Sequence, residues 1–236
     1  MKAFAALLTS LIYIRSRNAK LDLIDAYSKA TPDPDRVWAL AALIGNIDFP
    51  AVKAATVRAH ITERVDPVLF QLSRDYVGET VETVSLLWPD SSSQADIPTL
   101  GEVVHDLQSV TRATAGSVLA SLLDRMGADA RFATLKFATG GMRIGVSARL
   151  AKLAFAKAFG VDVNDVEEVL HGLQPPYAAL FAWAADGGAR PDVSALPSFR
   201  LFMLAPPLDD MEIDLAEFAV EWKWNGIRVQ IAHVGG

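Results

Sequence analysis

A lysine near the end of the chain has neighbours that suit a nucleophile. In the segment EWKWNGIRVQ, Lys223 lies between Trp222 and Trp224, and Arg228 follows five residues later. A lysine attacks an electrophile only as the neutral amine, a form that apolar surroundings or a cationic neighbour can favour. Glu221 comes two residues before Lys223, so on a strand both side chains would face one pocket. These residue types could carry covalent chemistry on a phosphorylated substrate.

The same segment also fits an ordinary β-hairpin. Asn225-Gly226 is the strongest short signal for a two-residue hairpin turn, because both residues accept positive φ angles. In that interpretation Lys223 is a solvated lysine beside a turn. Spacing alone leaves both interpretations open.

A second group of residues could bind a polyanion. The stretch from Arg131 to Val161 has six basic residues and no acidic one, in a chain whose formal net charge is −6. Basic residues concentrated in one part of an acidic protein let that part bind a polyanion while the other faces repel it. The six are Arg131, Lys136, Arg143, Arg149, Lys152 and Lys157.

Glycines surround the middle of this stretch. In TGGMRIGVSARL, three glycines flank Arg143. Glycines permit close approach of a backbone, and amides at the start of a following helix suit phosphate oxygens. The alternative is a glycine-rich connection between two helices, with basic residues that are merely solvated; the motif is no P-loop, since no Gly-Lys-Ser/Thr follows. The residues of the predicted phosphate-binding segment are Gly140, Gly141, Arg143, Gly145, Arg149 and Lys152.

Composition narrows the class of protein. The 236 residues are 51% hydrophobic, which provides for a large core. The absence of cysteine suits a reducing compartment, and four histidines without ligand spacing argue against a built-in zinc site. The first residues, MKAFAALLTSLIYI, have an apolar stripe at helical spacing and no signal-peptide cleavage site, and the longest apolar run is too short to span a bilayer. We expect a cytoplasmic protein with no membrane partner.

Residues 1–185 have the pattern of one helix after another. N-caps with proline at the first helical position are predicted at Asp33-Pro34 and Asp66-Pro67, and a capping box at Thr99 to Glu102. Further helical patterns cover 115–138, 147–159, 164–171 and 176–185.

The pattern changes after a segment rich in glycine and proline at 186–198. From Phe218 to Ile231 apolar and polar residues alternate, which predicts two strands around the Asn225-Gly226 turn. A lone hairpin is too little to be stable alone. We therefore expect a mainly α chain: an all-helical domain at 1–198, whose last part (about 186–198) is a linker, and the incomplete start of a β-containing domain at 199–236.

Several segments together resemble one enzyme family. EWKWNGIR resembles the first signature motif of ATP-dependent DNA ligases, Glu-x-Lys-x-Asp-Gly-x-Arg. FRLFMLAPPL looks like the segment that opens their nucleotidyltransferase domain, and TGGMRIGVSARLAKLAFAKAFG resembles the glycine-and-arginine segment of their helical DNA-binding domain. With RNAKL, TPDPDR, RVDPVLF, DYVGETVETVSLLWP and HGLQPPYAALFAW, essentially the whole chain looks like the N-terminal portion of the bacterial cisplatin-damage-response ATP-dependent DNA ligases. RNA ligases and mRNA capping enzymes share the first motif, but the long helical domain before it singles out DNA ligases.

The resemblance implies a role for each matching residue. Lys223 matches the lysine that becomes adenylated, Glu221 the acid that accepts from the adenine amino group, and Arg228 the arginine near the ribose and phosphate. Arg143 matches a contact to the DNA backbone. Asn225 departs from the pattern, because the family has aspartate there, and a negative charge beside the nucleophile is lost.

The resemblance also implies cofactors and partners. We expect ATP and Mg²⁺ as cofactors, with the metal ligands beyond this chain, and nicked double-stranded DNA as the substrate in repair, replication or recombination. The segment from 199 would begin an α+β nucleotidyltransferase domain, so the truncated chain alone would not seal nicks. We expect a monomer in the bacterial cytoplasm, associated with the nucleoid. The alternative from another class is a non-catalytic helical module that binds DNA or a protein partner.

Overall fold

The computed structural model describes residues 1–90 and 96–194 and seven isolated positions beyond them. The regular elements of these residues are helices, and no strand occurs among them. The helices are α1 (Lys2–Tyr13), α2 (Arg17–Ala30), α3 (Asp35–Ile44), α4 (Ala54–Thr62), α5 (Pro67–Val77), α6 (Thr80–Leu87), α7 (Leu100–Ser109), α8 (Ala115–Asp124), α9 (Ala128–Ala138), α10 (Ala148–Phe159), α11 (Val163–Gly172) and α12 (Ala178–Ala184).

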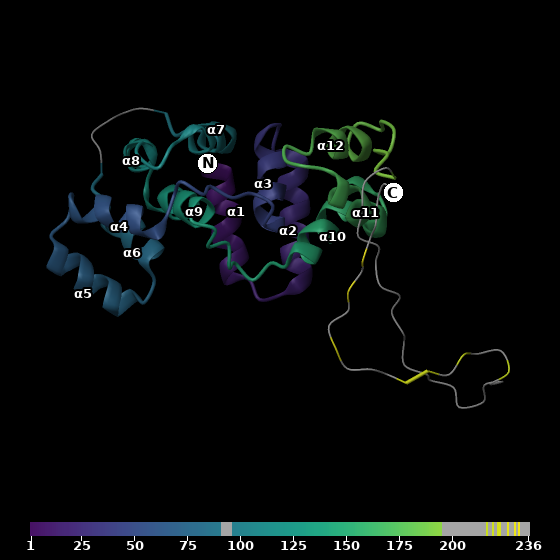
Figure 1. Cartoon of the computed structure of the whole chain (residues 1–236), viewed down its shortest axis with the longest axis horizontal. Coiled ribbons are helices and arrows are strands. Elements are labelled where there is room, and N and C mark those ends of the chain that lie inside the picture. Colours follow the sequence, from purple (N-terminus) through teal and green to yellow (C-terminus); the bar gives the residue numbers. More distant parts are fainter. Residues whose placement is uncertain are drawn as a thin grey trace.

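The first two helices pair with two helices from late in the chain at the centre of the helical region. α9 packs against α1, and α10 packs against α2 (Figure 1). On one side α4, α5, α6 and α8 form a lobe that joins the centre through α6 and α9. On the other side α3 and α11 pack on α10, and α12 packs on α11. The connection from α9 to α10 therefore crosses the middle of the molecule.

The apolar stripe predicted for the first residues is confirmed. Phe4, Leu7, Leu8 and Leu11 of α1 are buried, while Ile12, at the edge of the stripe, is 38% exposed. These side chains pack toward α9, where the ring of Phe4 meets that of Phe137 edge-on at 6.1 Å. No described helix is long and apolar enough to cross a membrane.

The predicted helix starts are confirmed at two of three places. The Asp66 carboxylate accepts from the N–H of Val68 and of Leu69, with proline next to it, and Thr99 forms a capping box with Glu102.

The N-cap predicted at Asp33 is wrong, because α3 begins at Asp35 and Pro34 holds the cap position. Asp33 instead pairs with Arg36 at 2.7 Å. The Asp35 carboxylate accepts from the backbone N–H groups of Leu100 (3.0 Å) and Gly101 (2.8 Å), so it caps a different helix, α7. A local proline signal could not reveal this use of a neighbouring carboxylate.

The pattern at 115–138 corresponds to two helices rather than one. α8 ends at Asp124 and α9 starts at Ala128, with Gly127 as the extended N-cap between them. The patterns near 147–159, 164–171 and 176–185 correspond to α10, α11 and α12 with bounds shifted by one or two residues. The hairpin expected at 218–231 and most of the domain expected at 199–236 lie outside the described residues, so both stay predictions.

Candidate nucleic-acid interface

The connection between α9 and α10, residues 139–147, begins with a glycine pair that ends a helix. Gly140 has a φ of +72°, a region that residues with a Cβ rarely adopt. The N–H of Gly141 donates to the carbonyl of Lys136 at 2.9 Å and closes the last turn of α9. A Cβ at Gly140 would meet nothing within 4 Å, so its backbone angle, not lack of space, favours glycine there.

The middle of this connection is held by two tight turns and one apolar anchor. The N–H of Arg143 donates to the carbonyl of Gly141 at 2.7 Å, and the N–H of Ile144 donates to that of Met142 at 3.0 Å. Ile144 is buried, whereas Arg143 beside it is exposed. The isoleucine fixes the loop to the core and leaves the arginine in solvent.

α10 begins directly after this loop. The hydroxyl of Ser147 accepts from the N–H of Leu150 at 3.2 Å, as an N-cap does. Arg149 is exposed in the first turn and Lys152 is partly buried in the second. A helix N-terminus carries a positive partial charge and backbone N–H groups without intrahelical partners, so it adds to the charge of these side chains.

Three of the six basic residues in the acid-free stretch are used by the fold itself. Arg131 is 2% exposed and bonds three backbone carbonyls and one carboxylate. The Nζ of Lys136 lies 3.3 Å from Glu79. Lys157 pairs with Asp22, and this hydrogen bond raises the pKa of Lys157. Acidic residues from other parts of the fold thus pair with basic residues of a stretch that has no acidic residue of its own.

The other three basic residues are different. Within residues 1–90 and 96–194, no acidic side chain pairs with Arg143, Arg149 or Lys152. The same is true of Arg15 and Arg17, which are exposed in and just after the connection between α1 and α2. We call these five residues the cationic edge.

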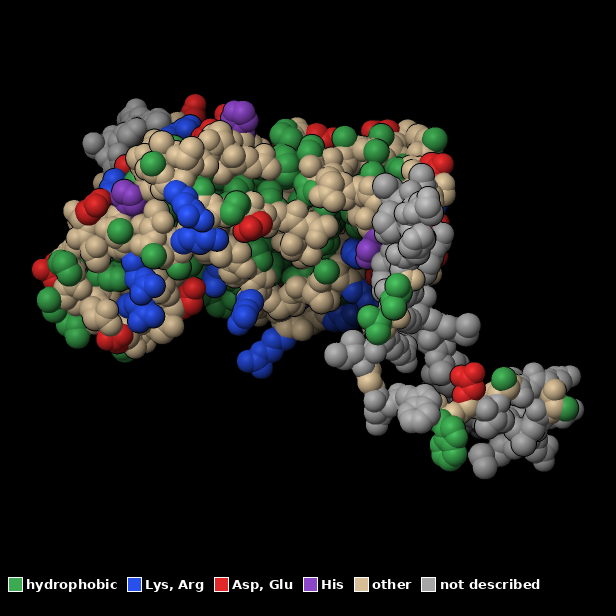
Figure 2. Space-filling model, viewed as in Figure 1, with side chains coloured by type: hydrophobic (Ala, Val, Ile, Leu, Met, Phe, Trp, Pro, Cys, Tyr) green, Lys and Arg blue, Asp and Glu red, His purple; other side chains and the backbone are tan. Residues whose placement is uncertain are grey.

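The members of the cationic edge come from two connections that lie together and from the helices that follow them: Arg15 and Arg143 lie in the connections, Arg17 begins α2, and Arg149 and Lys152 lie in the first two turns of α10. Figure 1 shows the α1–α2 and α9–α10 connections at the same lower edge of the molecule. Figure 2 shows Lys and Arg side chains along this edge of the same view. A cavity lined by Arg15, Arg17, Gly145 and Ser147, among others, joins the two connections.

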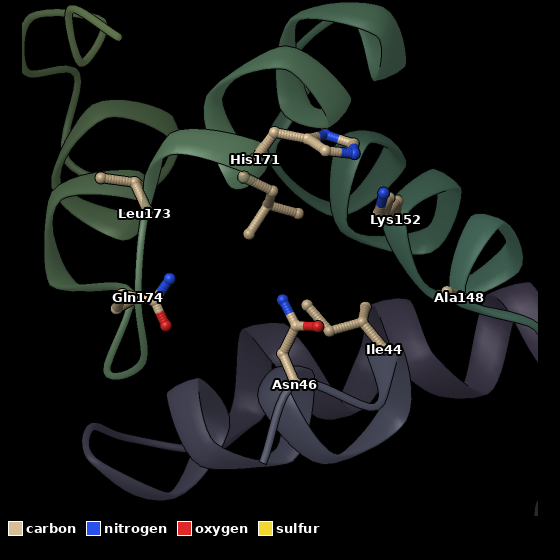
Figure 3. Close-up of a pocket in the computed structure, with 8 residues that line it drawn as sticks. Ile44, Asn46, Ala148, Lys152, His171, Leu173 and Gln174 are labelled. Carbon is tan, nitrogen blue, oxygen red and sulfur yellow. The ribbon is translucent and has the colours of Figure 1, made fainter. Parts of the chain in front are cut away.

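A second cavity lies on another side of α10. It has a volume of about 310 Å³ and is lined by residues from the end of α3, from α10 and from the end of α11. Figure 3 shows Asn46, Lys152, His171 and Gln174 around it. The Asn46 amide donates to the hydroxyl of Tyr177 at 2.8 Å, which fixes one side of the cavity. Among the described residues that line the cavity, Lys152 is the one Lys or Arg and none is acidic, so Lys152 lies where it can meet an anion.

This arrangement is suited to a phosphate backbone. Unpaired cations and helix amides bind phosphate oxygens, and contacts to phosphates position a protein on a duplex without reading its bases. The predicted residues Gly140, Gly141, Arg143, Gly145 and Arg149 lie together in one loop and the helix start after it. Lys152 lies one turn further, at the rim of the second cavity.

Sequence reasoning missed Arg15 and Arg17. The segment RSRNAK lies about 125 residues before the glycine loop, and only the packing of α2 against α10 brings the two together. The sequence did contain one signal for this part of the site: two arginines close together at a short connection between two amphipathic helices.

Most of the predicted catalytic motif around Lys223 lies outside the residues that the structure describes. Lys223, Asn225 and Arg228 lie outside the described residues, while Glu221 is described and exposed. Among the residues that the structure describes, no three His, Cys, Asp or Glu side chains could together hold a metal ion.

Three known proteins with related sequences are DNA ligases. The chain is 32% identical over 168 residues to a probable DNA ligase of Anaeromyxobacter sp. (strain Fw109-5), a match that covers 62% of this chain and 31% of that protein. It is 41% identical over 97 residues to a DNA ligase of Methanothrix thermoacetophila, covering 38% of this chain and 16% of the relative. It is 33% identical over 101 residues to a DNA ligase of Methanococcoides burtonii, covering 40% and 18%.

No family model matches the chain. The matches span less than a third of the length of these curated relatives. The chain is therefore related in sequence to part of the DNA ligases.

Proposed function

We propose that this chain is the N-terminal portion of an ATP-dependent DNA ligase of the bacterial cisplatin-damage-response type, and that its helical part holds duplex DNA by the sugar-phosphate backbone. The observation that carries the proposal is the cationic edge: five basic side chains without acidic partners in the described region, gathered around a tightly held loop and a helix N-terminus. The relationship to DNA ligases supports DNA as the polyanion.

The DNA contact would be independent of sequence. Contacts to phosphates fix the position of a protein on the duplex without reading its bases, which suits an enzyme that must act at nicks anywhere. Arg143 would contact one strand from the loop, and Arg149 and Lys152 would extend the contact along α10. Arg15 and Arg17 would extend it in the other direction.

The catalytic part of the proposal rests on the motif around Lys223. Its amine would attack the α-phosphorus of ATP and release pyrophosphate, AMP would pass to the 5′-phosphate at a nick, and the 3′-hydroxyl would displace AMP. Glu221 would accept from the adenine amino group, and Arg228 would lie near the ribose and phosphate. Mg²⁺ would neutralise phosphate charge in each displacement.

A second candidate function has one observation in its favour. α5 and α6 form an apolar groove whose lining includes Leu72, Tyr76 and Leu86, which are 64%, 93% and 62% exposed. Exposed apolar surface of this kind can mark a protein contact. A non-catalytic helical module that binds a protein partner would use this groove.

Mass spectrometry separates the two candidates. The protein in its full natural length, incubated with ATP and magnesium, should gain one AMP on Lys223 if it is a ligase. No covalent AMP at any pH would favour the non-catalytic module.

A salt titration of DNA binding tests the helical part directly. Fluorescence anisotropy with intact and nicked duplexes should give a log–log slope of about −3.6 if Arg143, Arg149 and Lys152 neutralise one phosphate each and Arg15 and Arg17 share one. Affinity should then fall roughly 150-fold between about 50 and 200 mM salt. Duplexes of different sequence should bind alike. Absence of binding at low salt would contradict the proposal.

A further inference from the structure

Lys20 is a buried cation beneath the cationic edge. It is 8% exposed, and its Nζ donates to the carbonyl oxygen of Gly145 at 2.8 Å and lies 3.4 Å from that of Ile144. No carboxylate of the described region pairs with it, whereas Arg131, also buried, reaches Asp90 at 3.0 Å. Two carbonyl dipoles satisfy two of the three N–H donors of a lysine but leave its full charge uncompensated.

The charge of Lys20 forms part of the wall of an open cavity of about 500 Å³. Two exposed arginines, Arg15 and Arg17, contribute to the lining on one side, and the loop and first turn of α10 contribute on the other. Among the described residues, no acidic one lines the cavity. It therefore combines a buried cation, two solvated cations and a helix N-terminus, which all favour a bound anion.

Gly145 is needed for this arrangement. Its φ is +69°, and a Cβ at this position would lie 2.6 Å from the Nζ of Lys20. Any side chain would push the ammonium away from the loop carbonyls. The third glycine of the loop thus makes room for a lysine from α2.

We propose that this cavity is a subsite for one phosphate group of the DNA backbone, with Lys20 as its buried cation and Arg15 and Arg17 at its rim. The inference rests on the proposed DNA-binding function and deepens it. A phosphate would supply the negative charge that no described carboxylate gives Lys20, and its oxygen would accept a hydrogen bond from the third N–H of the Lys20 ammonium.

The test replaces the charge and keeps the length of the side chain. Lys20→Met should make the salt slope for duplex binding shallower by about 0.9, the contribution of one phosphate. Lys29→Met is the matched control, because Lys29 is an exposed lysine of the same helix that pairs with Asp25 at 2.7 Å and is not among the residues that line the cavity. Lys29→Met should keep the wild-type slope.

A second variant covers the possibility that Lys20→Met does not fold. Arg17 is exposed and has no partner in the described part, so Arg17→Gln leaves the core intact. It should also lower the slope by about 0.9. Inorganic phosphate gives an independent measurement: at matched ionic strength it should raise the melting temperature of wild type and Lys29→Met above that in chloride. The rise should be smaller for Arg17→Gln or a folded Lys20→Met, in which only the general stabilisation by an excluded salt remains.

The outcomes separate the two proposals. If wild type does not bind duplex at low salt, the proposed function fails. If wild type binds but Arg17→Gln keeps its slope and its stabilisation by phosphate, the subsite is overturned and the proposed function stands. A Lys20→Met variant that folds and loses affinity with an unchanged slope also overturns the subsite, because the lysine would then only hold the loop.

Discussion

Arg131 and Arg143 belong to the same acid-free stretch but lie in opposite surroundings. Arg131 is buried between α6, α8 and α9, and its guanidinium bonds the carbonyls of Trp88, Pro89 and Leu123. Arg143 is exposed and has no ionic partner in the described residues. The two arginines are therefore only twelve positions apart, but the fold uses the first in its own hydrogen bonds and leaves the second in solvent, where it can bind a ligand.

The two arginines differ in which hydrogen-bond acceptors lie within reach of the guanidinium. Carbonyls in the last turn of a helix have no intrahelical partner. Arg131 satisfies such carbonyls at the ends of α6 and α8, where water has little access. Arg143 is exposed in the loop between α9 and α10, and no acidic side chain of the described residues pairs with it. Partners, rather than local charge in the sequence, decide which cations are available for binding.

Replacing Arg131 should have the largest effect on stability. Arg131→Ala removes a charged donor from three carbonyls, of which only that of Leu123 also accepts from a described backbone N–H (Met126, 3.1 Å), so we expect the free energy of unfolding to fall by about 3–5 kcal/mol. Urea denaturation followed by circular dichroism measures this loss. The salt slope of DNA binding by the folded fraction should not change. A stable variant with weakened DNA binding would reverse the assignments of the two arginines.

Replacing Arg143 and Arg149 together should have the largest effect on DNA binding. Arg143→Ala with Arg149→Ala removes two phosphate contacts, and the salt slope should become shallower by about 1.8. Since neither side chain has a partner in the described region, the free energy of unfolding should stay within about 0.5 kcal/mol of wild type. Anisotropy titrations and urea denaturation on the same preparation check both statements. An unchanged slope would remove this loop from the DNA contact.

Lys152 should contribute one contact. Lys152→Gln keeps most of the side chain's length and should lower the slope by about 0.9, without a change in stability. Gln in place of Lys152 in the cavity of Figure 3 also keeps a hydrogen-bond donor, so the loss should come from the charge alone. A variant indistinguishable from wild type would limit the interface to the α1–α2 and α9–α10 connections.

Replacing Lys157 should have the smallest effect on the salt slope of DNA binding. It lies in the same acid-free stretch, but Asp22 already pairs with it. We expect Lys157→Met to leave the salt slope unchanged, and the same anisotropy titration shows this. A slope reduced by one phosphate would mean that the ion pair opens when DNA binds.

Much of the fold could be predicted from local sequence. The helical class, the buried face of α1 and the caps at Asp66 and Thr99 depend on spacing within a few residues, and these predictions are confirmed. The cap predicted at Asp33 was wrong because the Asp33 carboxylate pairs with the Arg36 side chain and α3 begins only at Asp35. The Asp35 carboxylate in turn caps α7, a helix about 65 residues away.

The candidate site was predictable only in part. The glycine loop and Arg143 could be found from composition, because glycines and unopposed basic residues are local features. Arg15 and Lys20 could not, since they join the loop only through the packing of α2 on α10. The roles of Lys223 and Arg228 stay predictions from the motif.

The burial of Ile144 has a consequence for the rate at which DNA binds. A glycine-rich loop normally loses conformational freedom when it engages a ligand, and this slows association. Here the isoleucine anchor and the two tight turns fix the loop in the free protein. Encounter should then be limited by diffusion and electrostatic steering, so that added salt acts mainly on the association rate constant and much less on dissociation.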